Sequence, residues 1–477
     1  MSFKKSFLRN VARFGGYTYL VQFIEFASTI ILSRIISPEE YGFVALITVF
    51  SGFVFVFTNV GIMHAIIRND YDNDKLGRFF SLTIWIGLFL FTLFTLLAYP
   101  IALFYENMNL FFSSIVIGFG FITQAINFVP NAIASKALKF NTIGEARVLQ
   151  TVFQVIFMII LAFLNLSYWS LIIPITFSPL IQYLYYYYKM SFNRKYYRFK
   201  DAWHLLKEIR SLVGSITISG IINYWTGNTD NLVIGKVYGD AALGLYNRAY
   251  RFIFLAKRLI NSIFGIVLFP SLKKLKDDGG DVNKEFLSIL GIISIVNFPL
   301  GILLILFADP LVLILWGKDW IGVSPFLPYI GILILVQTVL MATRDFYVLQ
   351  NEEKTVLKIT VINSIVSIAG ILTGAFFSPL HIILFFTIAN TLMIPVQVII
   401  GFYKALNYKS RELYIFWGPK FLVSALFIYL IYFDFYIYQV ILTLIYFIHL
   451  FINQKQELLK FVTLFRNWLK RTNLYYK

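Results

Sequence analysis

The sequence predicts an all-α polytopic membrane protein with about fourteen transmembrane helices, in two six-helix lobes followed by two C-terminal helices. Three observations lead to this fold class: an apolar composition, apolar runs long enough to cross a bilayer, and basic residues concentrated in alternate loops. Of the 477 residues, 59% are hydrophobic and 14% are charged. Soluble chains are about 45–50% apolar and about 25% charged, so the composition excludes an ordinary soluble protein.

Apolar runs of about 20 residues recur along the chain, the length that crosses about 30 Å of hydrocarbon at about 1.5 Å per residue. The first run follows four basic residues and has no cleavage site of the A-x-A type, so we expect a retained span and not a signal peptide. The predicted spans are 14–36, 41–67, 79–104, 109–134, 145–165, 168–190, 211–236, 243–271, 285–308, 322–343, 355–378, 379–405, 413–433 and 435–453.

The charge of the loops orients these spans. Basic residues concentrate in the N-terminus, in 68–78, 136–147, 189–210, 273–284, 344–358 and 404–411, and in the C-terminal tail. Because Lys and Arg accumulate in cytoplasmic loops, we expect both termini in the cytoplasm. The net charge of +17 has the same explanation, so no nucleic-acid partner is expected. Trp169, Trp316 and Trp320 are predicted to mark the outer interface.

A weak internal repeat relates the two predicted lobes. Segment 233–236 resembles segment 31–34, and Leu243-Gly244 repeats Tyr41-Gly42 at the same spacing of 202 positions (233 minus 31, and 243 minus 41). An even number of spans per repeat places both halves the same way up. The predicted parts are an N-terminal lobe over 1–190, a cytoplasmic linker over 191–210, a C-terminal lobe over 211–405, and two spans with a tail over 406–477.

Basic residues within the eighth predicted span are the most informative, since ionisable groups in a membrane are costly and mark function. Arg248, Arg251 and Arg258 share one face of a helix, and Asn247 extends that face to a sector of about 100°. Such a stripe suits a water-filled cationic cavity. The alternative is that 243–258 forms a cytoplasmic amphipathic helix, which would leave too short a segment to cross the membrane.

Two further pairs occupy equivalent places in the two lobes. Arg34 and Lys236 end the first and seventh spans on the outer side. They either snorkel to the interface or complete the cationic cavity wall. Glu25 and Asp230 are acids within the same two spans. They are either charge partners of the arginines or a coupling site for a proton or sodium ion.

Polar side chains recur within several spans. Asn127, Gln154 and Asn390 belong to stripes in the fourth, fifth and twelfth spans, and Asn228 and Asn247 belong to the region of the seventh and eighth spans. Hydrogen bonding between helices explains such stripes. The alternative is a polar cavity lining that suits sugar hydroxyls.

Several kinds of site are not expected. The chain has no cysteine and four dispersed histidines, which argues against thiol chemistry and a metal site. Asp70-x-Asp72-x-Asp74 fails as a calcium loop, because Lys75 and Ser81 stand where Gly and Glu are required, so we interpret it as a solvated loop. No Walker A, G-x-S-x-G or H-E-x-x-H motif occurs. We therefore expect no enzyme and no cofactor.

The region of the seventh and eighth spans carries a recognisable pattern: N-x-D-N-L-V-I-G-K at 228–236, then Gly239, L-G-L-Y-N-R-A-Y-R at 243–251 and Phe269-Pro270. With S-R-I-I-S-P-E-E-Y-G at 33–42 and W-G-K-D-W at 316–320, it resembles the Wzx-like polysaccharide flippases of the multidrug/oligosaccharidyl-lipid/polysaccharide exporter superfamily. One departure is Lys257-Arg258, where relatives are usually apolar.

The resemblance implies a MATE-like fold in the bacterial inner membrane and a substrate, an undecaprenyl-pyrophosphate-linked oligosaccharide moved from the cytoplasmic to the periplasmic face. It implies alternating access, a monomer, contact with membrane lipids, and a polysaccharide polymerase and glycosyltransferases as partners. The planar guanidinium of Arg suits phosphate oxygens. A lipid II flippase and a multidrug exporter remain alternatives, although the arginines disfavour cationic drugs. A membrane glycosyltransferase or polymerase would need a larger outer loop.

Overall fold

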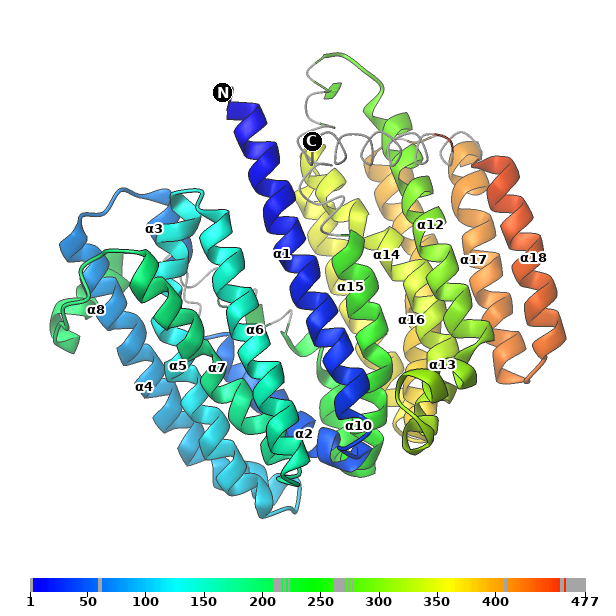
Figure 1. Cartoon of the computed structure of the whole chain (residues 1–477). Coiled ribbons are helices and arrows are strands. Elements are labelled where there is room, and N and C mark those ends of the chain that lie inside the picture. The colour runs from blue at the N-terminus through cyan, green and yellow to red at the C-terminus, as the bar shows by residue number, and fades with distance from the viewer. Residues whose placement is uncertain are drawn as a thin grey trace, which may run out of the picture. The chain divides into compact units, whose positions relative to one another are not determined.

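The computed structural model describes residues 3–58, 62–208, 224–260, 278–406 and 410–454, with a few single residues beside these ranges. Within them, every regular element is a helix (Figure 1). Ten of the described helices are long and apolar enough to cross a membrane. The prediction of an all-helical, multi-pass membrane protein is therefore confirmed, whereas the count of about fourteen spans stays a prediction. Most of the seventh predicted span before α10 lies outside the described residues.

Two long stretches of chain carry the helices. The first carries α1 (Phe3–Leu32), α2 (Pro38–Phe55), α3 (Ile62–Arg68), α4 (Asn73–Phe104), α5 (Asn109–Lys136), α6 (Phe140–Phe163), α7 (Trp169–Lys189), α8 (Phe199–Glu208) and α10 (Thr229–Ile260). The second carries α12 (Val282–Leu306), α13 (Ala308–Leu315), a 3-10 helix (Lys318–Phe326), α14 (Leu327–Leu349), α15 (Glu353–Gly374), α16 (Pro379–Gln397), a π-helix (Val398–Ala405), α17 (Ser410–Tyr432) and α18 (Tyr436–Asn453).

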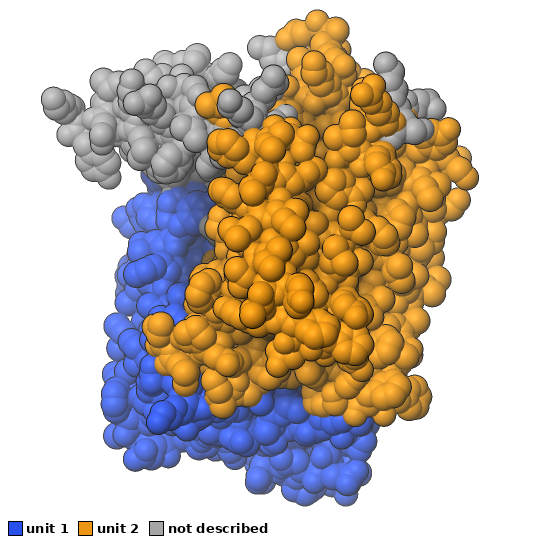
Figure 2. Space-filling model, turned by 90° about the vertical axis from the view of Figure 1, so that its right-hand side faces the viewer, with its two compact units in different colours: residues 1–245, 315–320 blue, residues 246–314, 321–477 orange. Residues whose placement is uncertain are grey.

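Packing divides the chain into two compact units, coloured separately in Figure 2. Unit 1 comprises residues 1–245 and 315–320, and unit 2 comprises residues 246–314 and 321–477. The division falls within α10. The lobe boundaries predicted from the sequence stay a prediction.

In unit 1, α4 packs on α5, and α7 packs on both α5 and α6. Helix α1 packs on α6, where a Cβ added at Gly144 would lie 2.2 Å from the ring of Tyr17. Only glycine allows so close an approach of a side chain to the backbone of α6. Small residues at helix contacts are how membrane helices gain van der Waals packing.

In unit 2, α12 packs on α14, α15 packs on α16, and α17 packs on α18. A Cβ at Gly331 would lie 2.5 Å from the carbonyl oxygen of Gly301, so α12 and α14 touch through their backbones. Near the ends of these helices the buried rings of Phe286 and Phe346 stack at 3.8 Å between centroids. Phe402 of the π-helix stacks on Phe286, so aromatic packing joins three elements.

The 191–210 segment, predicted as a linker, contains α8 and packs against α4. Ser81 Oγ donates to the carbonyl oxygen of Lys195 at 3.3 Å, and Trp85 Nε1 donates to that of Tyr197 at 3.2 Å. The first half of the 191–210 segment is thus hydrogen-bonded to α4 of unit 1.

The three aspartates of the 70–74 motif have structural roles at the start of α4. Asp72 caps the helix, Asp74 pairs with Arg78 at 2.8 Å, and Asp70 pairs with Lys136 at 2.7 Å. A carboxylate at a helix N-terminus satisfies free N–H groups. The interpretation of this motif as a charged loop agrees with these contacts.

Local signals define the start of α2 and the break within α10. At α2, the N–H of Ser37 donates to Glu40 Oε2 at 2.8 Å and the Glu40 N–H donates back to Ser37 Oγ at 3.4 Å, a capping box with Pro38 in the first turn. In α10 the helix breaks at Gly239, whose φ of 82° and ψ of −175° suit glycine. This break lies where the sequence predicts the boundary between the seventh and eighth spans.

Equivalent positions of the internal repeat meet beside these starts. A Cβ at Gly42 would lie 1.7 Å from the carbonyl oxygen of Asp240, and a Cβ at Gly244 would lie 2.0 Å from that of Pro38. Asp240 is the repeat equivalent of Pro38 (240 minus 38 is 202), and Gly244 is that of Gly42 (244 minus 42 is 202). The contact is therefore reciprocal, and the repeat has a structural counterpart.

Candidate functional site

The arginines of the predicted stripe differ in their environment. Arg248 is 2% exposed, whereas Arg251, one turn further along α10, is exposed and Asn247 is half-buried. The side chain of Arg258 lies outside the described residues, and Lys257 is half-buried. A membrane helix thus carries a buried guanidinium beside an exposed one.

The two acids predicted as a matched pair are not equivalent. Asp230, at the start of α10, is 4% exposed, and its Oδ1 accepts the N–H of Asn231 at 2.8 Å. Asn231 also donates to Asn228 Oδ1 at 3.4 Å, and Asn228 donates to the carbonyl oxygen of Tyr224 at 2.8 Å. Glu25 on α1 is exposed, which corrects the expectation that both acids are buried. The difference arises because spacing places a residue on a helix but does not say which neighbour covers it.

Lys236 and Arg34 both lie in unit 1 but have different surroundings. Lys236 Nζ pairs with Glu106 Oε1 at 2.8 Å, and both side chains are exposed. The Lys236 hydrogen bond holds the pKa of Glu106 below its usual value. Arg34 is exposed, and its guanidinium lies against the backbone of Gly317, where an added Cβ would be 2.5 Å from Nη1. The assignment of these two residues to the interface or to a cavity wall stays a prediction.

The W-G-K-D-W segment packs where α1 ends and α2 begins, within unit 1. Trp320 is fully buried, its Nε1 donates to the carbonyl oxygen of Ser33 at 2.9 Å, and its ring meets that of Tyr41 edge-on at 5.4 Å. Trp316 is also buried. Both side chains are thus buried within the protein, and their predicted position at the outer interface stays a prediction.

The polar stripes of unit 1 join helices. Asn127 on α5 is buried and donates to the carbonyl oxygens of Thr123 at 3.0 Å and of Pro179 on α7 at 2.9 Å. Ser178 Oγ on α7 donates to Gln154 Oε1 on α6 at 3.0 Å. These contacts are the interhelical hydrogen bonds that the stripes predict.

The stripe of unit 2 makes contacts of the same kind. Gln337 on α14 donates to Asn390 Oδ1 on α16 at 2.9 Å, and Thr343 Oγ1 donates to Gln397 Oε1 at 3.1 Å. Asn297 on α12 donates to Thr338 Oγ1 on α14 at 2.6 Å. Side-chain bonds of this kind between membrane helices are worth about 0.6 kcal/mol on average.

Two ionisable residues within spans were missed in the sequence. Glu145 on α6 accepts hydrogen bonds from Tyr17 on α1, at 3.4 Å, and from Tyr185 on α7. Lys420 on α17 is buried, and its Nζ donates to the carbonyl oxygen of Phe416 at 3.0 Å and lies 3.5 Å from the centroid of the Phe416 ring. Lys420 was visible as a charge within an apolar run, and Glu145 as a charge at the start of the fifth predicted span.

The comparisons with known proteins agree with these features. Residues 31–325 match the model of a family described as "Polysaccharide biosynthesis protein". An "Uncharacterized membrane protein in cps region" of Klebsiella pneumoniae is 27% identical over 311 residues, 63% of this chain and 62% of the relative. The lipopolysaccharide biosynthesis protein WzxC of Escherichia coli (strain K12) is 25% identical over 318 residues, 65% and 63% of the two chains. The chain thus spans less than two thirds of the length of these relatives.

Solved structures share the fold. The lipid II flippase MurJ, in an inward closed conformation, aligns over 93% of this chain and 99% of its own, with a TM-score of 0.68 and 16% identity. An inward-facing MATE family multidrug resistance transporter of the MOP superfamily aligns over 82% and 96%, with a TM-score of 0.65 and 16% identity. At such identities the likeness shows the fold alone, and that fold is the one shared by MurJ and MATE transporters.

Proposed function

We propose that this protein is a flippase, because the chain belongs to the family of polysaccharide biosynthesis proteins, as a Wzx-like member. Its substrate is an undecaprenyl-pyrophosphate-linked oligosaccharide repeat unit. The protein moves it from the cytoplasmic to the periplasmic face of the bacterial inner membrane, for surface polysaccharide synthesis. The observation that carries this proposal is Arg248, a cation that is 2% exposed in a helix of a multi-pass membrane protein.

The chemistry of the substrate headgroup gives the arginines their role. A pyrophosphate carries negative charge on several oxygens, and a guanidinium can bind two such oxygens side by side. Arg248 and Arg251 stand at i and i+3 on α10, so they are neighbours on the helix surface. The exposed Arg251 makes the first contact with the headgroup, and the buried Arg248 holds it away from water, where charge interactions are stronger.

Movement of the headgroup through a cationic cavity requires alternating access. The fold that the chain shares with MurJ and MATE transporters supports this mechanism. About fourteen spans with both termini cytoplasmic complete the proposed topology. A proton or sodium ion is the proposed coupling ion. Asp230 is the better candidate for this ion than Glu25, because it is the buried acid.

A lipid II flippase is the second candidate, since MurJ has the same fold. A polymerase and glycosyltransferases that extend or build the repeat unit are the proposed partners, with membrane lipids around the chain. A multidrug exporter is disfavoured, because a buried arginine repels cationic drugs.

Deletion of the gene tests these alternatives. The proposal predicts loss of surface polysaccharide and accumulation of lipid-linked repeat units. A lipid II flippase predicts lysis and loss of peptidoglycan synthesis instead. Normal surface glycans with altered drug sensitivity would contradict the proposal and favour an exporter.

A further inference from the structure

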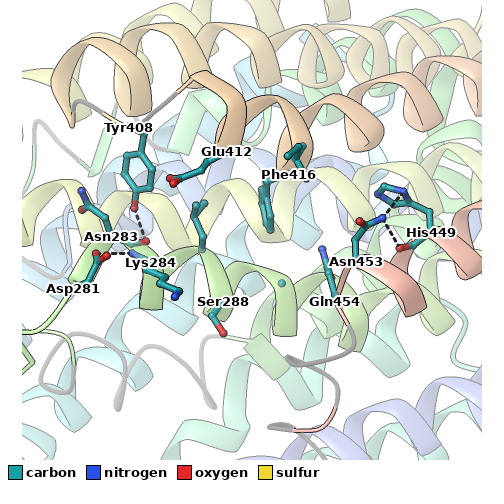
Figure 3. A pocket seen from close by; sticks show the side chains of 13 residues that line it. Asp281, Asn283, Lys284, Ser288, Tyr408, Glu412, Phe416, His449, Asn453 and Gln454 are labelled. Carbon is teal, nitrogen blue, oxygen red and sulfur yellow. Dashed lines mark hydrogen bonds between the residues drawn. The ribbon is translucent and has the colours of Figure 1, made fainter.

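A pocket of about 550 Å³, lined by both polar and apolar side chains, lies in unit 2, where α12 and α17 begin and α18 ends (Figure 3). By the loop charges this is the cytoplasmic end of the three helices. Neither Arg248 nor Arg251 is among the described residues that line it, so it is separate from the candidate site above. Its volume is in the range of ligand pockets, about 300–1,000 Å³.

One side of the pocket is acidic. Asp281 caps α12, with Oδ1 accepting the N–H of Lys284 at 3.0 Å, and Glu412 lies in the first turn of α17. Tyr408 is buried beside them, and its hydroxyl donates to the carbonyl oxygen of Asn283 at 2.9 Å. Burial raises the pKa of Tyr408, and the Asp281 and Glu412 carboxylates raise it further. Both carboxylates therefore act on one phenol from the same side of the pocket.

The other side is formed by the end of α18. The amide nitrogen of Asn453 is engaged with His449, at 3.0 Å from Nδ1 and 3.1 Å from the carbonyl oxygen. Asn453 also carries an amide oxygen, which is an acceptor, and the neighbouring Gln454 adds a second amide that is 7% exposed. This side thus offers uncharged acceptors and donors together with an imidazole.

Phe416 stands between the two sides (Figure 3). Lys420 Nζ lies 3.5 Å from the centroid of its ring and donates to its carbonyl oxygen at 3.0 Å. These two contacts hold the Phe416 ring in place. Phe416 is therefore an apolar surface of defined orientation beside the polar side chains of the pocket.

The side chains that line the pocket carry charges of both signs, which favours an uncharged ligand. Asp281 and Glu412 repel an anion, whereas Lys284 repels a cation. A neutral polyhydroxyl ligand has no such conflict, because its O–H groups donate to carboxylates and amide oxygens and its oxygens accept from amide and ammonium groups. The C–H face of a sugar ring also suits the ring of Phe416.

We propose that this pocket binds a sugar of the oligosaccharide substrate on the cytoplasmic side, before transport. The volume fits roughly one or two hexose rings. The inference rests on the proposed function for the identity of the sugar, and it adds a recognition site outside the arginine-bearing helix. It makes the pocket a determinant of which repeat units the protein accepts.

Saturation-transfer NMR on the purified full-length protein tests the inference. The probes are the oligosaccharides released by mild acid from the surface polysaccharide of the source strain. O-phosphoethanolamine and inorganic phosphate are the competing probes. We expect transfer to the sugar, reduced at least about tenfold in Glu412→Gln, because a site that hydrogen-bonds a hydroxyl discriminates strongly when the partner is lost. Phe416→Leu should weaken binding without changing the charge.

Matched controls come from the same helix and the turn beyond it. Tyr414→Leu removes an exposed aromatic residue of α17, and Asp434→Asn removes an exposed acid at a position whose φ of 57° suits asparagine. Both should leave the signal within about twofold. Three results would each overturn the inference: no saturation transfer to the sugar, the same transfer in Glu412→Gln as in the wild type, or binding of phosphoethanolamine in place of sugar.

The two proposals fail in different ways. If deletion of the gene leaves surface polysaccharide unchanged, the proposed function fails, whatever the pocket binds. If deletion stops export but Glu412→Gln binds and exports the native repeat unit like the wild type, the pocket inference fails alone. Because Glu412→Gln changes no volume, a folding defect in Phe416→Leu does not remove the test.

Discussion

Gly42 and Gly244, equivalent residues of the internal repeat, each lie directly against the backbone of the other repeat, at Asp240 and at Pro38. A Cβ at Gly42 would lie 1.7 Å from the carbonyl oxygen of Asp240, and one at Gly244 would lie 2.0 Å from that of Pro38. The obstacle at both positions is backbone, which cannot move aside as a flexible side chain can. Two helix starts thus meet at a contact that only glycine permits, at the end of the helices that the loop charges assign to the outer face.

Replacement of either glycine should separate these helix starts. We expect Gly42→Ala or Gly244→Ala to lower the free energy of unfolding by about 1–3 kcal/mol through overpacking, and to impair export. Thermal unfolding in detergent and surface polysaccharide in the deletion strain are the measurements. Gly16→Ala is the control, because a Cβ there meets nothing within 4 Å. An unchanged melting temperature in both variants would show that the contact is not as tight as described.

Loss of the buried cation should impair transport. We expect Arg248→Ala to reduce export at least about tenfold, which corresponds to about 1.4 kcal/mol, with normal membrane levels. Arg248→Lys should recover part of this loss, because it keeps the charge but not the planar fork. Export is read as surface polysaccharide, and Arg68→Ala, at the exposed end of α3, is the control. Full export in Arg248→Ala would remove Arg248 from the headgroup site.

The exposed pair of Lys236 and Glu106 should matter little. Because exposed ion pairs contribute close to nothing, Glu106→Gln should leave export and the melting temperature nearly unchanged. The lowered pKa of Glu106 means that its small contribution is present above the unfolded pKa and is lost as the pH falls through the folded pKa. Melting curves at neutral and acidic pH measure it. A loss of export in Lys236→Gln as large as in Arg248→Ala would instead place Lys236 in the cavity wall.

The attachment of α8 to α4 is open to a direct probe, because the chain has no cysteine. Tyr197 bridges Asp74 and Asn193, and Ala202 on α8 is fully buried. We expect Ala202→Cys to react slowly with a maleimide, and Tyr197→Phe to speed this reaction by about fivefold, since one hydrogen bond is worth about 1 kcal/mol. Lys200→Cys, an exposed position on α8, is the control. Equal rates with and without the Tyr197 hydroxyl would contradict the attachment.

The helices were predictable because a span needs a continuous apolar run. The break in α10 was predictable because the sequence places a loop, with Gly239 in it, between the seventh and eighth spans. The polar stripes were also interpretable, since Asn127 and Asn390 bond across helices as such stripes do. These properties depend on periodicity and composition, which are local in sequence.

Burial was less predictable. Periodicity placed Arg248 and Arg251 on one face, yet one is buried and the other exposed, because spacing along a helix does not say which neighbouring elements cover each side chain. Glu25 is exposed where a buried acid was expected. Trp320 is buried because its ring packs against Tyr41 and its Nε1 donates to the carbonyl oxygen of Ser33. Such contacts join residues nearly 300 positions apart in a 477-residue chain, and no local pattern contains them.

The central claim is that the buried cation of α10 moves a pyrophosphate-linked sugar across a bilayer. The direct measurement is flipping in proteoliposomes, in which lipid-linked oligosaccharide in the inner leaflet becomes accessible to an external glycosidase. The account predicts protein-dependent exposure of the sugar that Arg248→Ala abolishes and Arg68→Ala retains. Two results would contradict the account. One is sugar exposure by Arg248→Ala equal to that by the wild type. The other is no sugar exposure by the wild type, even under a proton or sodium gradient imposed in either direction.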